Sequence, residues 1–377
     1  MRTTAGRRPH MVVLALLAAC SGISLHAQAP PAKNPLLRLA QPWPSAEQML
    51  QRKAEAEALR LFAAEDPIAL TLRGDFRTIN RDRDPNSRKQ YPAELTIARE
   101  NGEPRTISVM LGARGHVRRM ARTCEYVPIR MTLPEDLKDT VFEGQDVLKL
   151  VVQCRNGAAS EQYLLREYLV YRVLNAITPR SFRARQVSMS YVDPAGTPIG
   201  TRHGMLLEDD GDVAKRMEGR IVELPRALFA DLEQRTLDAM MMFEYIIGST
   251  DFSIYALHNV VLVQTQDRTL YPVPYDFDMT GLVSPPYAIP DRRLPIGSVK
   301  ERLYRGPCRT LEQIEAILAP VRAQRDRVMA LPDAIAGLTS NSRDEAKSYL
   351  DAFYSATREQ KDVKRLFVDG CSKAPTM

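Results

Sequence analysis

The chain has 377 residues, of which 44% are hydrophobic and 26% charged, and its formal net charge at pH 7 is +6. This composition excludes a disordered or collagen-like chain and allows a large core in one two-lobed domain or in two domains. Part of the positive charge comes from three arginines near the N-terminus, so the net charge does not indicate a nucleic-acid partner and we expect none.

Residues 1–28 are typical of an export signal. The three arginines precede an apolar stretch, Met11 to Ala19, that is too short to span a bilayer. Leu17 to Cys20 fits a bacterial lipobox, which predicts a lipid anchor on Cys20, whereas Leu25 to Ala27 offers ordinary signal-peptidase cleavage. Either route exports the protein, as an outer-membrane lipoprotein or as a periplasmic or secreted protein. We expect no transmembrane helix in the remainder.

Four cysteines follow the leader, at positions 124, 154, 308 and 371. An even number of cysteines in an exported chain predicts two disulfides, and three pairings are possible. We favour Cys124 with Cys154 and Cys308 with Cys371. The chain has no CxxC pair and its histidines are scattered, so a zinc site is not expected.

The first half of the chain is rich in strand patterns. Residues 29–64 are predicted to form a tether and a helix over 45–63, with Ser45 as its N-cap. Alternating or continuous apolar runs then predict strands at 68–72, 93–98, 105–111, 126–132, 147–152, 184–192 and 203–207. One helix, at 160–178, interrupts them. We therefore expect a strand-rich N-lobe over residues 65–210. Its basic segment, 113–130, is interpreted as a solvated face in preference to a polyanion site.

The second half is mainly helical in pattern. Helices are predicted at 226–248, 311–329, 342–355 and 358–367, with two short strands at 260–264 and 270–275 and a Pro-rich segment at 281–308. We therefore expect a helical C-lobe over residues 211–377.

Candidate catalytic residues surround the two short strands. Asp251 precedes the first strand, Asn259 lies at its entrance, and Asp276 closes the second. Antiparallel strands of this length bring Asn259 and Asp276 together, and one carboxylate, one amide and substrate phosphates suffice for Mg²⁺. Asp278 lies on the same face as Asp276 if the strand continues, and is a further candidate ligand. The alternative is that these are turn residues, which Asp and Asn favour.

Three residues of the N-lobe extend this site. Lys149 is the charged residue of an apolar strand, and Glu167 lies on an apolar helix face, where an acid is costly unless paired. We expect the two to form an ion pair that directs the ammonium at nucleotide phosphates, with a purely structural pair as the alternative. Glu208 follows a strand at the expected lobe junction, where backbone groups could hold an adenine; the alternative is a solvated strand end.

The order Lys149, Glu167, Asp251, Asn259, Asp276-Phe277-Asp278 resembles the CotH family of spore-coat protein H kinases, over about residues 105–280. The resemblance implies an α+β, two-lobed protein-kinase-like fold, ATP and Mg²⁺ as ligands, and phosphoryl transfer to a protein hydroxyl. It implies that Lys149 holds nucleotide phosphates and that Glu167 orients it. It further implies that Asp251 is the catalytic base and that Asn259 and Asp276 bind the metal.

Two other functional classes remain open. One is a kinase-fold binding or envelope-structural protein that has lost catalysis. The other is a hydrolase that uses paired carboxylates, for instance on glycosides. The single tryptophan of the chain argues against a sugar-stacking groove.

Overall fold

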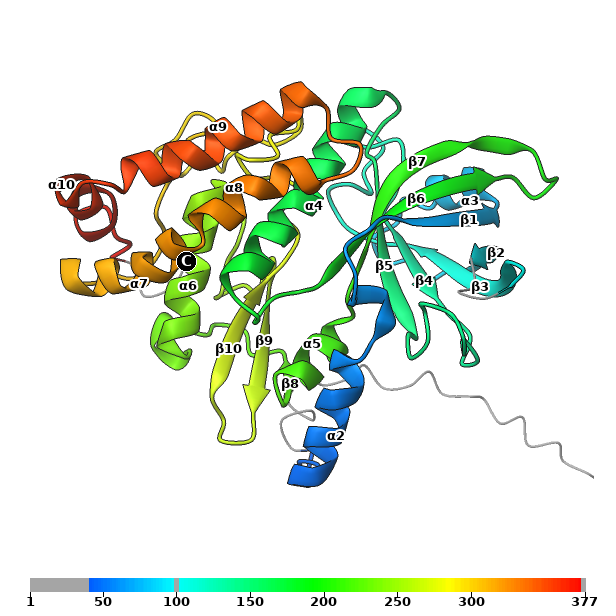
Figure 1. Cartoon of the computed structure of the whole chain (residues 1–377), viewed down its shortest axis with the longest axis horizontal. Helices are drawn as coiled ribbons and strands as arrows, with labels where there is room; N and C mark the ends of the chain where they lie inside the picture. Colours follow the sequence, from blue (N-terminus) through cyan, green and yellow to red (C-terminus); the bar gives the residue numbers. More distant parts are fainter. Residues whose placement is uncertain (1–40, 98–101, 374–377) are drawn as a thin grey trace, which may run out of the picture.

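The computed structural model describes residues 41–97 and 102–373 of the chain (Figure 1). The predicted leader, the lipid-anchor candidate Cys20 and the first part of the tether lie outside these residues. Within them, no helix combines the length and the apolar character needed to cross a membrane.

Seven strands close into a barrel, on the right in Figure 1, in the order β1-β2-β3-β4-β5-β7-β6. The strands are β1 (Ile68–Gly74), β2 (Tyr91–Ile97), β3 (Arg105–Ala113), β4 (Ile129–Thr132), β5 (Val147–Val152), β6 (Ala184–Val192) and β7 (Pro198–Leu207). Neighbours are antiparallel except β1 and β6, whose parallel pairing places Ile68 opposite Val187 and closes the barrel. Alternate side chains point inward, so that Leu72, Leu95 and Leu150 are buried in its core.

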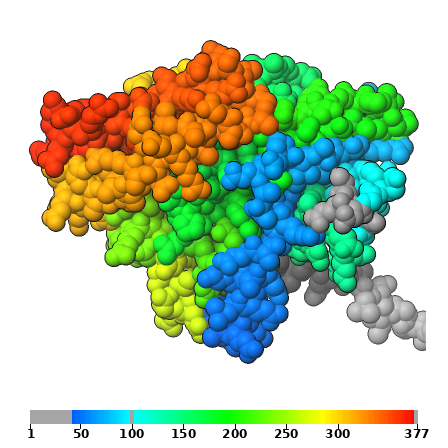
Figure 2. Space-filling view, viewed as in Figure 1, coloured from blue at the N-terminus to red at the C-terminus, as the bar shows by residue number. Residues whose placement is uncertain are grey.

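One helix precedes the first strand in the chain and another follows it. Helix α2 (Ala46–Glu57) begins at the predicted cap, because Ser45 Oγ accepts from the Gln48 amide while Gln48 Oε1 accepts from the Ser45 amide. A 3₁₀ turn (Arg60–Phe62) leads into β1, and α3 (Phe76–Arg81) follows it. Helix α2 packs against α5 (Asp210–Arg216), and Figures 1 and 2 show it running along one face of the molecule toward β8 and β9.

A second core lies beside the barrel and is built largely from helices. Helix α4 (Ala158–Ile177) contacts both β7 of the barrel and α6, α8 and α9 of this core. The remaining helices are α6 (Gln234–Ile247), α7 (Leu311–Ala323), α8 (Arg325–Ala334), α9 (Ser340–Ala356) and α10 (Gln360–Val363), which continues as a π-helical turn (Lys364–Val368). Because α4 contributes to both parts, its side chains can reach a site between them.

The second core also contains a three-stranded antiparallel sheet in the order β10-β9-β8. Its strands are β8 (Gly219–Val222), β9 (Val260–Thr265) and β10 (Leu270–Pro274). Helix α6 ends at Gly248 in the left-handed conformation (φ 67°), where a Cβ would strike the hydroxyl of Tyr349. The segment after β10 lies against this end of α6, where Leu282 N donates to Ile247 O at 3.0 Å.

The predicted two-lobed kinase-like fold with a helical C-lobe is wrong. Residues of the first half form a closed seven-stranded barrel, and the second half adds a small sheet to its helices. The periodicity of a strand shows which face is buried but not which strand it pairs with. Closure depends on the pairing of β1 with β6, which lies far along the chain, and no local sequence pattern predicts that contact.

Most individual elements agree with the sequence patterns, and β5 and β6 have the bounds predicted. The long helix predicted from residue 226 begins only at Gln234, and the helix predicted at 311–329 is two helices that meet at Gln324. Three short elements were not predicted: α3, α5 and β8. Each has no more than seven residues, too few for a periodic pattern to be decisive.

Both disulfides pair as favoured by the sequence, Cys124 with Cys154 and Cys308 with Cys371. Cys154 follows β5 directly, and Cys371 lies close to the C-terminal end of the described residues. Two such bonds are consistent with an exported protein, because the cytoplasm keeps thiols reduced.

Candidate functional site

The hairpin of β9 and β10 brings Asn259 and Asp276 together, as predicted. Tyr275 N donates to Asn259 O at 3.0 Å, which continues the pairing of Val260 with Pro274. Both residues adopt a left-handed backbone, with φ of 54° for Asn259 and 64° for Asp276. Asn and Asp tolerate that conformation better than most residues, so these side chains suit both the backbone and a role at the open end of the sheet.

Asn259 and His258 hold the side chain of Asp251. The Asn259 amide nitrogen donates to the Asp251 backbone oxygen at 2.7 Å and to its carboxylate at 3.2 Å. His258 Nε2 lies 3.1 Å from the other carboxylate oxygen, and this hydrogen bond is the main cause that raises the pKa of His258. The Asp251 side chain remains 37% exposed. The carboxylate is therefore fixed in orientation while still open to a ligand.

Arg305 fixes the loop that carries Asp251 from behind. Its Nη1 donates to the carbonyl oxygens of Thr250 and, at 3.1 Å, of Phe252, and its guanidinium lies 4.8 Å from the Phe252 ring centre. Beneath the loop, burial raises the pKa of Glu244 to about 8. Arg305 comes from the Pro-rich segment near the Cys308–Cys371 disulfide, so this segment contributes directly to the site.

Phe277 anchors the Asp276-Phe277-Asp278 segment. Its ring packs edge-on against Tyr171 of α4 and Phe243 of α6, with ring centres 4.8 Å and 5.3 Å apart. The Tyr171 hydroxyl also accepts from the Asp276 backbone amide at 3.1 Å. Two helices therefore set the position of both aspartates through the residue between them.

Asp278 is buried close to Asp276, but the expectation that a continuing strand would bring them to one face is wrong. The strand ends at Pro274 and does not continue through Asp278. Asp278 is 6% exposed, and Tyr287 donates its hydroxyl to the Asp278 carboxylate at 3.0 Å. Burial, with the charge of Asp276 as the next cause, raises the pKa of Asp278 to about 7.

Glu167 lies at the same centre but does not pair with Lys149, so that predicted ion pair is wrong. Its partner is Arg118, with Nη1 3.4 Å from the Glu167 carboxylate, while Arg118 Nη2 donates to the carbonyl oxygen of Val152. Burial raises the pKa of Glu167 to about 8 despite Arg118, and the charges of Asp278 and Asp276 act in the same direction. The acids of the centre are thus only partly compensated.

Lys149 bonds instead to Asp210 at the start of α5. Its ammonium also lies 5.4 Å and 5.5 Å from the ring centres of Phe182 and Tyr275. Lys149 therefore borders the centre through Tyr275, the residue before Asp276. The unpredicted helix α5 supplied the competing carboxylate, which is why the sequence favoured the wrong partner.

Glu208 is fully buried and has a structural environment. Its carboxylate accepts from the guanidinium of Arg183 at 2.7 Å and from that of Arg216 at 2.8 Å, and its backbone amide donates to Arg183 O. The next two residues, Asp209 and Asp210, line a cavity of about 590 Å³ together with Val261 and Tyr275. Glu208 is therefore held in a buried ion cluster, and the open space lies beside it at this cavity.

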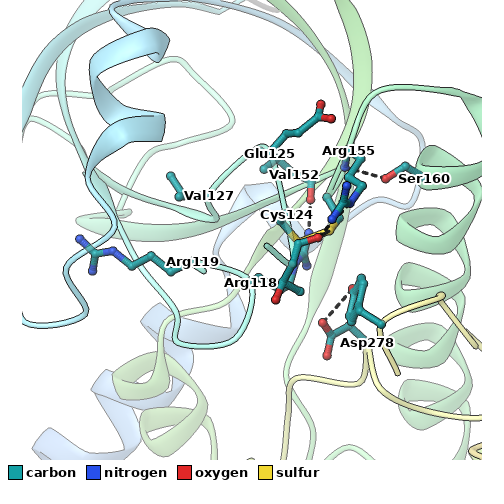
Figure 3. The surroundings of a disulfide bond; sticks show 12 residues. Arg118, Arg119, Cys124, Glu125, Val127, Val152, Arg155, Ser160 and Asp278 are labelled. Carbon is teal, nitrogen blue, oxygen red and sulfur yellow. Dashed lines mark hydrogen bonds between the residues drawn. A yellow bond between two sulfur atoms is a disulfide. The ribbon is translucent and has the colours of Figure 1, made fainter. Parts of the chain in front are cut away.

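Sequence reasoning missed Arg118, Tyr287 and Arg305 as parts of the site. The interpretation of 113–130 as a solvated face is wrong for Arg118 and Arg119, which are 8% and 2% exposed. Figure 3 shows these neighbours pointing in opposite directions: Arg119 pairs with Asp82, while Arg118 contacts Glu167 and the Val152 carbonyl oxygen. The signal available was that apolar residues, among them Val117 and Met120, are interspersed with the arginines before Cys124.

Asp276 and the side-chain oxygen of Asn259 could contribute ligands to a cation but do not form a complete metal site by themselves. Among residues 41–97 and 102–373, no three His, Cys, Asp or Glu side chains are grouped as a metal centre. Magnesium commonly takes one or two carboxylates and completes its octahedron with water and phosphate oxygens. The side-chain nitrogen of Asn259 donates to Asp251, which leaves the side-chain oxygen of Asn259 as the candidate metal ligand beside Asp276.

Comparison with known proteins does not assign the chain to a family. No protein-family model matches it, and no curated protein matches it significantly. What the chain does must be argued from the chemistry of the site.

Proposed function

We propose that the chain is an exported phosphotransferase that moves the terminal phosphoryl group of ATP, with Mg²⁺, to a hydroxyl of a protein acceptor, as its resemblance to the CotH family implies. The observation that carries this proposal is the gathering of Asp251, Asn259 and Asp276 at one end of the β9–β10 hairpin. Glu167 and Asp278 lie beside them in a centre with more acids than cations. Such a centre favours a ligand that brings a divalent cation.

Each residue has a distinct role in this proposal. Asp251 accepts the proton of the acceptor hydroxyl as its oxygen forms a bond to phosphorus and the bond to the leaving ADP breaks. Asn259 orients Asp251, and its carbonyl oxygen, with Asp276 and Asp278, would hold Mg²⁺. The metal would neutralise charge on the phosphates. The cavity beside Asp209 and Asp210 would take the nucleoside, and Lys149 holds Asp210 in its wall.

The proposed location is outside the cytoplasm, as an outer-membrane lipoprotein anchored at Cys20 or as a periplasmic or secreted protein. ATP is scarce in such compartments. A second candidate is therefore a protein that binds nucleotide or an envelope partner without catalysis. The observation that favours it is that both carboxylate oxygens of Asp251 already have hydrogen-bond partners, His258 and Asn259.

The deciding experiment measures thermal unfolding of the mature protein with ATP and Mg²⁺, followed by phosphate transfer from labelled ATP to envelope proteins. A native-state ligand at 100 times its Kd stabilises by about 2.7 kcal/mol. We expect a stabilisation that requires both ATP and Mg²⁺, and label in a protein acceptor. No stabilisation at millimolar nucleotide excludes both the phosphotransferase and a protein that binds nucleotide without catalysis. Stabilisation without phosphate transfer selects the non-catalytic protein.

Two variants assign the roles. Asp276→Asn preserves the left-handed backbone and side-chain shape but removes the charge, so the Mg²⁺-dependent part of the stabilisation should disappear. Asp251→Asn should bind nucleotide normally and transfer no phosphate. Full transfer by Asp251→Asn would refute its role as base, and an unchanged Mg²⁺ effect in Asp276→Asn would remove Asp276 from the metal site.

A further inference from the structure

Arg118 presents a buried, incompletely paired guanidinium to a large cavity. The residue is 8% exposed, and its Nε has no hydrogen-bond partner among the described residues. Its other nitrogens contact the Glu167 carboxylate and the Val152 carbonyl oxygen. An unsatisfied buried donor is costly, so a cation in this state is suited to a ligand that brings acceptor oxygens.

The cavity next to Arg118 has a volume of about 810 Å³, within the range of small-molecule sites. The segment before Cys124, the start of α4 and the Pro-rich segment contribute its walls. Arg118, Arg122 and Arg155 supply positive charge to the lining, which also includes the acids Glu167 and Asp278. Figure 3 shows Arg118 beside the Cys124–Cys154 disulfide, with Asp278 on the neighbouring segment.

Lys149 is less suited than Arg118 to bind phosphate at this centre. Its ammonium is bonded to Asp210 and lies against two aromatic rings, and it does not line the cavity. Arg118 contacts the one acid, Glu167, that was expected to orient the phosphate-binding cation. A guanidinium also offers five donors in a planar fork, so it can keep Glu167 and still contact phosphate oxygens.

We propose that Arg118 is the phosphate-binding cation of this site and that Glu167 is the positioning residue that directs it. The ligand class is a polyphosphate, in the form of a nucleoside triphosphate, whose anionic end enters the cavity between Arg118 and Asp278. This inference rests on the proposed function for the nucleoside part of the ligand, but not for the phosphate part.

The test uses the mature protein and three probes: ATP with Mg²⁺, adenosine, and inorganic tripolyphosphate with Mg²⁺. Calorimetric titration compares the wild type with Arg118→Gln, and with Arg327→Gln at an exposed position of α8 outside this cavity as the control. We expect Arg118→Gln to weaken ATP and tripolyphosphate at least tenfold and to leave adenosine unchanged. Arg327→Gln should change each affinity by less than threefold, and Lys149→Gln should weaken tripolyphosphate less than Arg118→Gln does.

Arg118→Gln leaves Glu167 buried without a partner, which can prevent folding. The double variant Arg118→Gln/Glu167→Gln removes both charges and keeps both shapes, and it should fold and still fail to bind tripolyphosphate. Wild-type affinity for tripolyphosphate in either variant overturns the inference, as does an equal loss of ATP and adenosine. If the wild type binds tripolyphosphate but not ATP, the proposed function fails and the Arg118 site stands. If it binds neither, both fail.

Discussion

The side-chain amide of Asn259 donates to two oxygens of Asp251, the backbone carbonyl at 2.7 Å and the carboxylate at 3.2 Å. The two residues therefore behave as one unit, in which the entrance of β9 fixes the loop after α6. Any chemistry at Asp251 depends on Asn259, whether or not Asn259 itself contacts a ligand.

Asn259→Gly tests this unit, because glycine accepts the left-handed backbone (φ 54°) and removes only the side chain. We expect the free energy of unfolding to fall by about 1–3 kcal/mol, since Asp251 loses a buried donor. We also expect phosphate transfer to fall more than nucleotide binding. Asn259→Ala should cost a further ~1 kcal/mol in backbone strain. Equal stability of wild type and Asn259→Gly, measured by urea unfolding, would show that the amide does not hold the loop.

Phe277→Ala should lower the free energy of unfolding by about 3–5 kcal/mol, because the ring is buried between Tyr171 and Phe243. Phe277→Leu, which retains most of the volume, should cost less than half as much and is the control. The aspartates on either side should lose their fixed positions in the alanine variant. Mg²⁺-dependent binding should therefore weaken even at temperatures where Phe277→Ala is fully folded. Normal binding under those conditions would contradict this positioning role.

Glu244 should make the protein less stable as pH rises from about 5 to about 8. Burial raises its pKa from the usual 4.5 to about 8, so the folded state binds a proton that the unfolded state has released between these values. The free energy of unfolding is then highest below pH 4.5 as far as this group is concerned, falls through the interval and levels off above pH 8. Glu167 and Asp278 add slopes of the same sign.

Glu244→Gln should therefore flatten, but not abolish, the fall in the free energy of unfolding between pH 5 and 8. It should be more stable than the wild type at pH 8.5. Met242→Leu, a volume-conserving change on the same buried helix that alters no titratable group, is the control and should leave the slope unchanged. A wild-type slope in Glu244→Gln, measured by urea unfolding across this range, would mean that Glu244 ionises freely in the folded protein.

Removing either disulfide by paired serine substitutions should cost about 2–5 kcal/mol of unfolding free energy. The bonds span 30 residues in Cys124–Cys154 and 63 residues in Cys308–Cys371. Loop entropy alone makes these two losses differ by less than about 1 kcal/mol. A much larger difference, measured by thermal and urea unfolding of the two double variants, would show that native contacts near one bond decide its value.

The sequence predicted those parts of the site that depend on local geometry. The proximity of Asn259 and Asp276 follows from a short antiparallel hairpin, in which each residue has a defined partner. The helix cap at Ser45 follows in the same way from side-chain hydrogen bonds within one turn. The favoured cysteine pairs each lie within one half of the chain, and the structure confirms both.

The parts that could not be predicted depend on which distant segments meet. Lys149 and Glu167 are close in the chain, but Lys149 has Asp210 from α5 as its partner and Glu167 has Arg118 from an irregular loop. Charge attraction acts between any two opposite charges that the fold brings together. An opposite charge nearby in the sequence is therefore a weak predictor of the partner. The barrel was not predicted for a related reason, since its closing pair joins strands that are far apart in the chain.

The parallel pairing of β1 with β6 has a consequence for how the chain acquires its structure. Strand β1 can form its antiparallel pair with β2 early, but its other edge finds no partner until residues up to Val192 are available. A chain that emerges from its N-terminus therefore exposes one unpaired strand edge throughout the synthesis or export of everything between β1 and β6. Such an edge is a template for aggregation, so the barrel is the part of this protein whose maturation depends most on protection from neighbouring chains.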